Sequence, residues 1–293
     1  MEFLQPLTWA EALQLKAAYP HAVPIQGGTD VMVELNFDRY RPEYLLDLTR
    51  VGDLAEWTPD GGRIWLGAGV TYTRVQTELG DRLPGLAMAS RTVGSLQIRN
   101  RGTVGGNLGA ASPAGDAHPP LLAACAQVEV ESVRGTRLIP ADEFYTGVKR
   151  NALEPDELIK AVLVTPPAGP QQFCKIGTRN AMVIAVCAFG FALHPKNGTV
   201  GTGIGSAAPT PRRAPEAELF LTEELAERGL WHRGGLLGPA VIQRFGELAA
   251  AAASPIDDVR GSADYRRHAL AVMARRTLTW SWNEYTQSLR SAA

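Results

Sequence analysis

A glycine-rich stretch at residues 98–116 constrains this chain more than any other feature. It reads IRNRGTVGGNLGAASPAGD, with five glycines and almost no bulky apolar side chain. It is too long and too poor in apolar residues for a packed strand or helix, so we expect a loop whose backbone a ligand approaches closely. Consecutive free backbone N–H groups form an anion nest, for which we expect the pyrophosphate of a dinucleotide. The alternative is a plain flexible loop.

A second glycine loop favours the ligand-binding alternative. Residues 23–31 read VPIQGGTDV, so a short apolar run ends in two glycines, a hydroxyl and a carboxylate. Two such loops, about 75 residues apart, can clamp one extended ligand from two sides. Neither is a P-loop, because no lysine follows the glycines. The segment GTGIG at 201–205 imitates a Rossmann motif, but it follows the turn signal Asn197–Gly198 and leads into prolines instead of a helix.

Composition excludes several classes of protein. The 293 residues are 45% hydrophobic and 20% charged, as in ordinary globular proteins. The formal net charge of -1 argues against a nucleic-acid partner. No run of eighteen apolar residues occurs, so we expect no membrane span, and the first residues lack the pattern of a signal peptide. Three widely spaced cysteines, Cys125, Cys174 and Cys187, are interpreted as buried apolar residues in a reducing cytoplasm.

The positions of proline and glycine residues predict the domain organisation. The clearest linker is the segment Pro166-Pro167 to Gly169-Pro170. We therefore predict a first domain at residues 1–168, divided into subdomains at about 1–57 and 58–168, and a second domain at 169–293. Three apolar strands and then three helical patterns follow the linker, which is typical of an α+β domain.

The two loops also resemble those of a known family. The pair formed by QGGTD at 26–30 and RGTVGGNLGAASPAGD at 101–116 is similar to the FAD-binding subunit of molybdenum hydroxylases, which include xanthine dehydrogenase and carbon monoxide dehydrogenase. The resemblance covers nearly the whole chain. It implies an α+β fold, in which two α/β subdomains of a PCMH-type FAD-binding fold precede a C-terminal domain of a three-stranded antiparallel sheet with a helical bundle.

The resemblance also implies which residues bind FAD. The first loop and its entry strand would hold the pyrophosphate through the backbone, together with the second loop. Asp116 would hydrogen-bond the sugar-alcohol part of FAD, Val93 would face the adenine, and Ile159 and Lys175 would approach the flavin ring. The two loops comprise Ile25, Gln26, Gly27, Gly28, Thr29, Asp30 and Val31, and Thr103, Val104, Gly105, Gly106 and Asn107. No catalytic acid, base or nucleophile is singled out.

The function implied by the resemblance is electron transfer. A large molybdopterin subunit would hydroxylate the substrate, and a small subunit with two [2Fe-2S] clusters would pass electrons to FAD on this chain. The final acceptor would be NAD+, oxygen or another molecule. This chain lacks the cysteine-bearing insertion that some relatives use for an iron–sulfur cluster, so we expect no metal here. Residues 181–184, AMVI, lack an aspartate that many relatives have after the position of Arg179.

Two alternatives stay open. A stand-alone flavin oxidase would need its own acid–base group, for which His21 and His118 are the candidates. A structural subunit that has lost FAD is the third possibility, and the intact glycines of both loops count against it.

Overall fold

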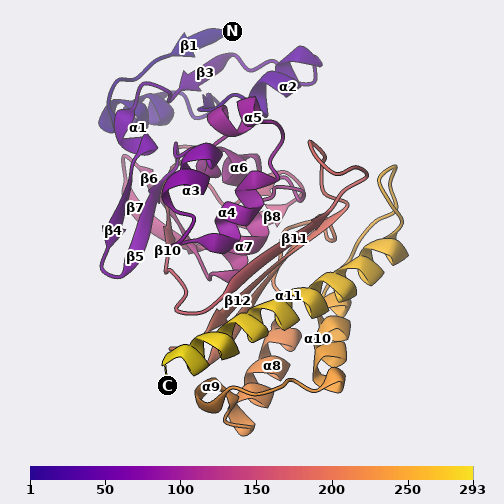
Figure 1. Cartoon of the computed structure of the whole chain (residues 1–293). Coiled ribbons are helices and arrows are strands. Elements are labelled where there is room, and N and C mark those ends of the chain that lie inside the picture. The colour runs from indigo at the N-terminus through magenta and orange to yellow at the C-terminus, as the bar shows by residue number, and fades with distance from the viewer. Residues whose placement is uncertain (293) are drawn as a thin grey trace.

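The computed structural model describes residues 1–292, which form three stacked parts. Figure 1 shows a small N-terminal unit at the top, a larger antiparallel sheet with its helices in the middle, and a three-stranded sheet with a helical bundle at the bottom. The expected α+β architecture is therefore confirmed.

The N-terminal unit is a small parallel sheet with two helices. Its strands lie in the order β1-β3-β2, and both pairings are parallel. The Thr8 side chain caps α1 by accepting a hydrogen bond from the N–H of Glu11, as expected of a capping box. The elements are β1 (Glu2–Leu4), α1 (Trp9–Ala18), β2 (Val23–Ile25), α2 (Val31–Asn36) and β3 (Tyr44–Asp47).

The middle unit is a five-stranded antiparallel sheet in the order β4-β5-β10-β6-β7. Its strand β6 alternates half-buried and buried residues, as a strand with one face on the core should. The strands are β4 (Trp57–Asp60), β5 (Arg63–Gly67), β6 (Gln127–Ser132), β7 (Gly135–Pro140) and β10 (Leu158–Val164); β8 (Tyr145–Gly147) pairs with β9 (Arg150–Asn151). The helices are η1 (Gly52–Ala55), α3 (Tyr72–Glu78), α4 (Pro84–Arg91), α5 (Leu96–Arg101), α6 (Val104–Ala110) and α7 (His118–Ala123).

The glycine-rich stretch is largely helical, so the expectation of a loop at 98–116 is wrong for most of it. Ser95 caps α5 and Thr103 caps α6, each through a hydroxyl that accepts a backbone N–H. Helix α6 ends at Ala110, and its C-cap residue Ala111 adopts the left-handed conformation with φ of 45°. Packing of Val104 and Leu108, both fully buried, outweighs the low helix propensity of its glycines.

The C-terminal part begins with an antiparallel sheet in the order β11-β12-β13. Its helices cover one face of the sheet, and α11 crosses the lower part of the molecule diagonally in Figure 1. The elements are β11 (Gln171–Ile176), β12 (Cys187–His194), β13 (Thr199–Gly205), α8 (Pro215–Glu227), α9 (Leu230–Arg233), α10 (Pro239–Ala251) and α11 (Ala263–Ala292).

The two faces of this sheet differ in side-chain size. The residues toward the bundle are large, and Phe189, Phe191 and Ile204 are almost fully buried there. The residues toward α7 are small. A Cβ at Gly203 would lie 2.0 Å from the carbonyl oxygen of Pro119, and a Cβ at Gly201 would lie 2.0 Å from that of Ala123. The GTGIG segment therefore lets a helix backbone approach the sheet, and its resemblance to a nucleotide motif is accidental.

Two large hydrophobic cores support the predicted division of the chain. One core draws its residues from positions 12–164 and the other from positions 187–285. The boundary between residues 168 and 169 stays a prediction.

The cysteines only partly follow the expectation. Cys187 is buried and Cys174 is half-buried, but Cys125 is exposed. The expectation is wrong for Cys125 because the turn after α7 places this residue in the left-handed conformation, with φ of 51°, at the surface. None of the helices among residues 1–292 combines the length and the hydropathy that a membrane-spanning helix requires.

We expect Gly203→Ala to destabilise the chain, because a methyl group cannot fit against the carbonyl of Pro119. Overpacking of this kind costs about 1–3 kcal/mol of the free energy of unfolding. Urea denaturation measures this change. Gly52→Ala is the matched control, since within residues 1–292 no atom beyond its immediate chain neighbours lies within 4 Å of the added Cβ. Equal stability of the two variants would contradict the close approach of α7.

Candidate functional site

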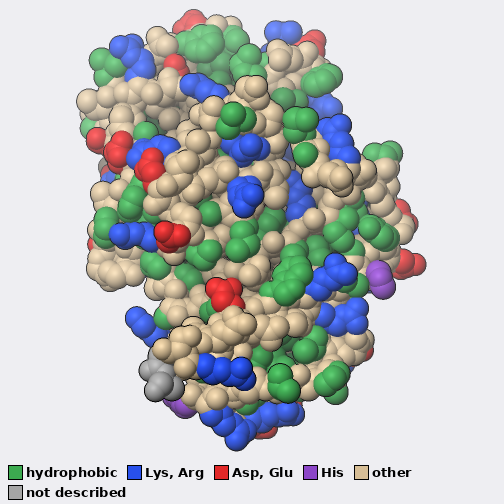
Figure 2. Space-filling view, viewed as in Figure 1, with side chains coloured by type: hydrophobic (Ala, Val, Ile, Leu, Met, Phe, Trp, Pro, Cys, Tyr) green, Lys and Arg blue, Asp and Glu red, His purple; other side chains and the backbone are tan. Residues whose placement is uncertain are grey.

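A cavity of about 1300 Å³ lies where the two glycine motifs meet the C-terminal sheet. In Figure 2 the face is hollowed between the upper unit and the loops of the lower part, with Lys and Arg side chains beside the opening. Most of the sequence-predicted residues line this cavity: Gln26, Gly27, Gly28, Thr29, Asp30, Val31, Val93, Thr103, Gly105, Gly106, Asn107, Asp116, Ile159 and Lys175. Ile25 and Val104 do not line it; Ile25 is half-buried on β2, and Val104 is part of the core.

The first motif carries the free backbone donors. Within residues 1–292, the N–H groups of Gly27, Gly28, Thr29 and Asp30 donate no hydrogen bond to protein atoms. Gly28 has φ of 75°, a conformation that favours glycine. Four successive free donors beside a cavity are suited to an anion such as a phosphate.

The glycines of these motifs also allow the backbone segments to pack. A Cβ at Gly27 would lie 2.0 Å from the carbonyl oxygen of Arg101, so the first motif rests directly on the start of the second. A Cβ at Gly105 would lie 2.4 Å from the Cβ of Ala68. Among the described residues beyond its own helix, only Ile159 would lie within 4 Å of a Cβ at Gly109, and Ile159 also lines the cavity. Only some of the glycines therefore leave space for a ligand.

The second motif does not form the expected nest of free N–H groups. The N–H of Val104 donates to the carbonyl of Val70, and that of Gly105 donates to the carbonyl of Ala68. The N–H of Gly106 donates to Thr103 Oγ1, at 3.0 Å. The expectation is wrong for these donors because the start of α6 pairs with the segment after β5, and because its cap residue Thr103 accepts the N–H of Gly106.

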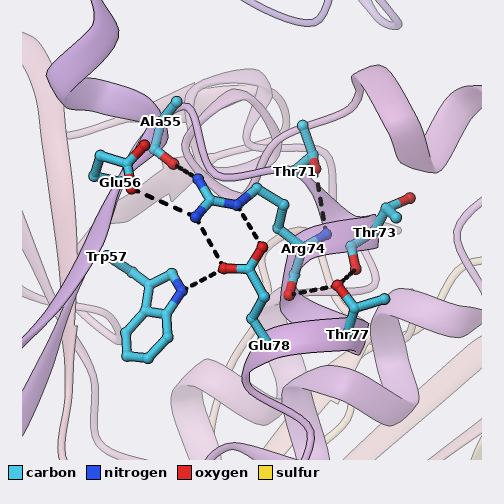
Figure 3. A network of polar contacts seen from close by, with 8 residues as sticks. All are labelled: Ala55, Glu56, Trp57, Thr71, Thr73, Arg74, Thr77 and Glu78. Carbon is cyan, nitrogen blue, oxygen red and sulfur yellow. Dashed lines mark hydrogen bonds and ion pairs between the residues drawn. The ribbon is translucent and has the colours of Figure 1, made fainter.

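Helix α3 is fixed against the second motif at its first turn. The N–H of Tyr72 donates to the carbonyl of Gly102, and Thr71 caps the helix. Farther along α3, Figure 3 shows the Arg74 guanidinium paired with Glu78 and donating to the carbonyl of Ala55, which ties α3 to η1. These contacts hold Tyr72 at the cavity wall.

Several buried polar atoms of the cavity have no protein partner. Within residues 1–292 these atoms are Gln26 Oε1, Tyr72 OH, Asn107 Oδ1, Asp116 Oδ1, Ser206 Oγ and Arg266 Nε, and each of these residues lines the cavity. Leaving a buried polar atom unpaired costs about 1–3 kcal/mol, so such atoms are rare unless a ligand or water satisfies them. Their concentration at one cavity indicates a polar ligand with hydrogen-bond donors and acceptors.

Asp116 and Lys175 form a buried ion pair across the junction with the C-terminal sheet. Lys175 Nζ lies 2.6 Å from Asp116 Oδ2, and both side chains are 7% exposed. Burial raises the pKa of Asp116, although the Lys175 ammonium opposes this shift. Thr92 contacts both partners, with Oγ1 3.0 Å from Asp116 Oδ2 and the carbonyl 3.2 Å from Lys175 Nζ.

His118, one of the two histidines considered for acid–base chemistry, is a core residue. It is fully buried, its Nδ1 lies 2.7 Å from the hydroxyl of Tyr145, and it does not line the cavity. Burial lowers the pKa of His118 to about 3. The other candidate, His21, is exposed and does not line the cavity either. Neither histidine is placed to exchange a proton with a ligand there.

Because His118 is buried in its neutral form, we expect the free energy of unfolding to depend on pH. Below pH 6.5 the unfolded chain binds a proton that the folded chain takes up only near pH 3, so stability falls as the pH is lowered through this window. The slope approaches about 1.4 kcal/mol per pH unit. We expect His118→Asn to lose this part of the slope in urea titrations, whereas His21→Asn keeps it. An unchanged slope in His118→Asn would refute the assignment.

Two family models cover most of the chain. The FAD-binding domain in molybdopterin dehydrogenase matches residues 1–167, and the CO dehydrogenase flavoprotein C-terminal domain matches residues 172–281. The putative xanthine dehydrogenase FAD-binding subunit of Escherichia coli is 30% identical over 93% of this chain and 92% of its own length. The nicotinate dehydrogenase FAD-subunit of Eubacterium barkeri is 34% identical over 69% of this chain and 71% of its own length. A chain of the solved carbon monoxide dehydrogenase of Hydrogenophaga pseudoflava superposes with a TM-score of 0.87 and 26% identity over 97% of this chain and 98% of that chain.

The fold and the family matches together show that this chain is an oxidoreductase flavoprotein whose cofactor is FAD. More narrowly, the chain belongs to the molybdenum hydroxylase family, as an FAD-binding subunit.

Two residues at the site, Tyr72 and Thr92, were not predicted from the sequence. Tyr72 lies outside both glycine motifs, and the local pattern beside it is only the helix-capping residue Thr71, which carries no information about a ligand. Thr92 directly precedes the predicted Val93, and its contacts depend on a strand about 80 residues away. Such contacts become visible only in the folded chain.

We expect Tyr72→Phe to weaken FAD binding while leaving the fold intact. The Tyr72 hydroxyl is buried without a protein partner, so its loss should raise the Kd of FAD about threefold to tenfold. In the FAD-free chain the same change should be neutral or stabilising. Tyr145→Phe is the matched control: its hydroxyl is paired with His118, so it should lose about 1 kcal/mol of stability and keep the FAD affinity. An unchanged Kd in Tyr72→Phe would show that this hydroxyl does not face FAD.

Proposed function

We propose that this chain holds FAD between the iron–sulfur clusters of a small partner subunit and a final electron acceptor, such as NAD+ or oxygen. The observation that carries the proposal is the coincidence of free backbone donors and unpaired buried polar atoms at one cavity. Bound FAD supplies the redox chemistry, for which protein side chains alone are unsuited. The chain supplies binding, orientation and electrostatics.

The two motifs have different tasks in this proposal. The free N–H groups of residues 27–30 bind the pyrophosphate, and the second motif supplies the surface against which the first motif packs. The free Oδ1 of Asp116 accepts from a hydroxyl of the sugar-alcohol chain. Val93 faces the adenine, and Ile159 and Lys175 approach the flavin ring, as the family resemblance implies.

The partner subunits are proposed from the relatives. The superposed relative is a carbon monoxide dehydrogenase, and another similar protein is called the medium chain of that enzyme. We infer that this chain is also a medium subunit, which joins a small subunit with two [2Fe-2S] clusters and a large molybdopterin subunit.

A stand-alone oxidase is the less favoured alternative. It would need an acid–base group beside its substrate. The buried position of His118 and the position of His21 outside the cavity argue against these two candidates.

The first test is the visible spectrum of the purified chain, followed by identification of the released flavin. We expect one FAD per chain. Gly109→Leu should reduce the FAD content to less than about a tenth of the wild-type value, because the new side chain fills the open space beside Ile159. Gly52→Leu, which lies in open space outside the cavity, should keep its FAD. Equal FAD contents in the two variants would place FAD elsewhere.

The electron-transfer part has its own test. We expect purification from the native source to yield two further subunits, one containing iron and sulfide and one containing molybdenum. Chemically reduced complex should regain the visible absorbance of oxidised flavin when mixed with NAD+ or with oxygen, and the faster reaction identifies the acceptor. A chain that carries FAD but turns over an organic substrate without partners would favour the stand-alone oxidase.

A further inference from the structure

The two carboxylate oxygens of Asp116 have different surroundings. Oδ2 contacts Lys175 Nζ at 2.6 Å and Thr92 Oγ1 at 3.0 Å. Oδ1 is buried and has no partner within residues 1–292. The carboxylate is therefore anchored through one oxygen, and the other is free to accept a hydrogen bond from a ligand.

Thr92 is the residue that contacts both members of the ion pair. It follows the last residue of α4, and its carbonyl accepts a hydrogen bond from Lys175 Nζ at 3.2 Å. Its hydroxyl has a single proton and two acceptors in reach, the carbonyl of Ala89 at 2.8 Å and Asp116 Oδ2 at 3.0 Å. An ionised acceptor forms the stronger hydrogen bond, so the proton favours the carboxylate.

We propose that Thr92 is a positioning residue of the FAD site, which acts through Asp116. Thr92 does not line the cavity, whereas Asp116 and Lys175 do. By holding Oδ2 together with Lys175, Thr92 fixes the carboxylate in the orientation that leaves Oδ1 for a hydroxyl of the bound ligand. The inference rests on the proposed function, since it assigns a supporting residue to the same site.

The arrangement also limits what Lys175 does. Its ammonium has three N–H donors, of which two are directed to Asp116 and to the carbonyl of Thr92. The positive charge is therefore paired with a buried carboxylate and does not face the cavity as an isolated cation. Removal of the Thr92 hydroxyl removes one of the two contacts that hold Asp116 Oδ2 in the ion pair.

The test is a double-mutant cycle on the FAD affinity of the full chain. FAD is removed, and its rebinding is followed by flavin fluorescence in the wild type, Thr92→Val, Asp116→Asn and the double variant. We expect Thr92→Val to raise the Kd about tenfold, the size expected for a lost hydrogen bond to a charged group. Thr92→Ser, which keeps the hydroxyl, should stay within about twofold of the wild type. In the Asp116→Asn background, Thr92→Val should have no further effect.

A merely structural role gives a different pattern. Thr92→Val would then lower the free energy of unfolding of the FAD-free chain but leave the Kd unchanged, or its effect on the Kd would add to that of Asp116→Asn. Either result overturns the inference. A wild-type chain that takes up no FAD, alone or with its partner subunits, overturns the proposed function instead. In that case the unfolding free energies of the same four proteins decide whether Thr92 holds Asp116, because absent coupling overturns this inference as well.

Discussion

The close approach of α7 to the C-terminal sheet is the constraint on which the site depends. Gly201 and Gly203 lack the Cβ atoms that would collide with carbonyl oxygens of α7, so the helix lies directly on the strands. Asp116 stands just before α7, and Lys175 lies on β11 of the same sheet. Because the helix and the sheet are held at this distance, the two charged groups meet at 2.6 Å.

A second backbone contact assembles the other end of the cavity. The first motif lies against the carbonyl of Arg101, which a side chain at Gly27 would prevent. The N–H groups of the second motif donate to the segment after β5 and to the cap residue Thr103, whereas the N–H groups of the first motif stay free. The two motifs are thus complementary: one gives packing support, and the other leaves backbone N–H donors free beside the cavity.

Within this frame, the unpaired polar atoms give the cavity its chemical character. Gln26, Tyr72, Asn107 and Asp116 come from four different segments, yet each leaves a buried atom without a partner beside the same space. An apolar core would not tolerate this arrangement, whereas a dinucleotide with phosphates, sugar hydroxyls and ring nitrogens can satisfy it. The cavity is therefore suited to hold a cofactor such as FAD.

The sequence by itself determined the two glycine motifs and the linker at 166–170, because these are local patterns, and the resemblance of the two motifs to a known family implied the α+β architecture. The sequence did not reveal that the second motif starts a helix, since burial of Val104 and Leu108 outweighs the glycines only when the core is assembled. Which N–H groups stay free, and the contacts of Tyr72 and Thr92, were decided by the tertiary structure. The physical reason is that a hydrogen bond depends on the acceptor that packing brings near, and for Lys175 this acceptor lies 59 residues away, on Asp116.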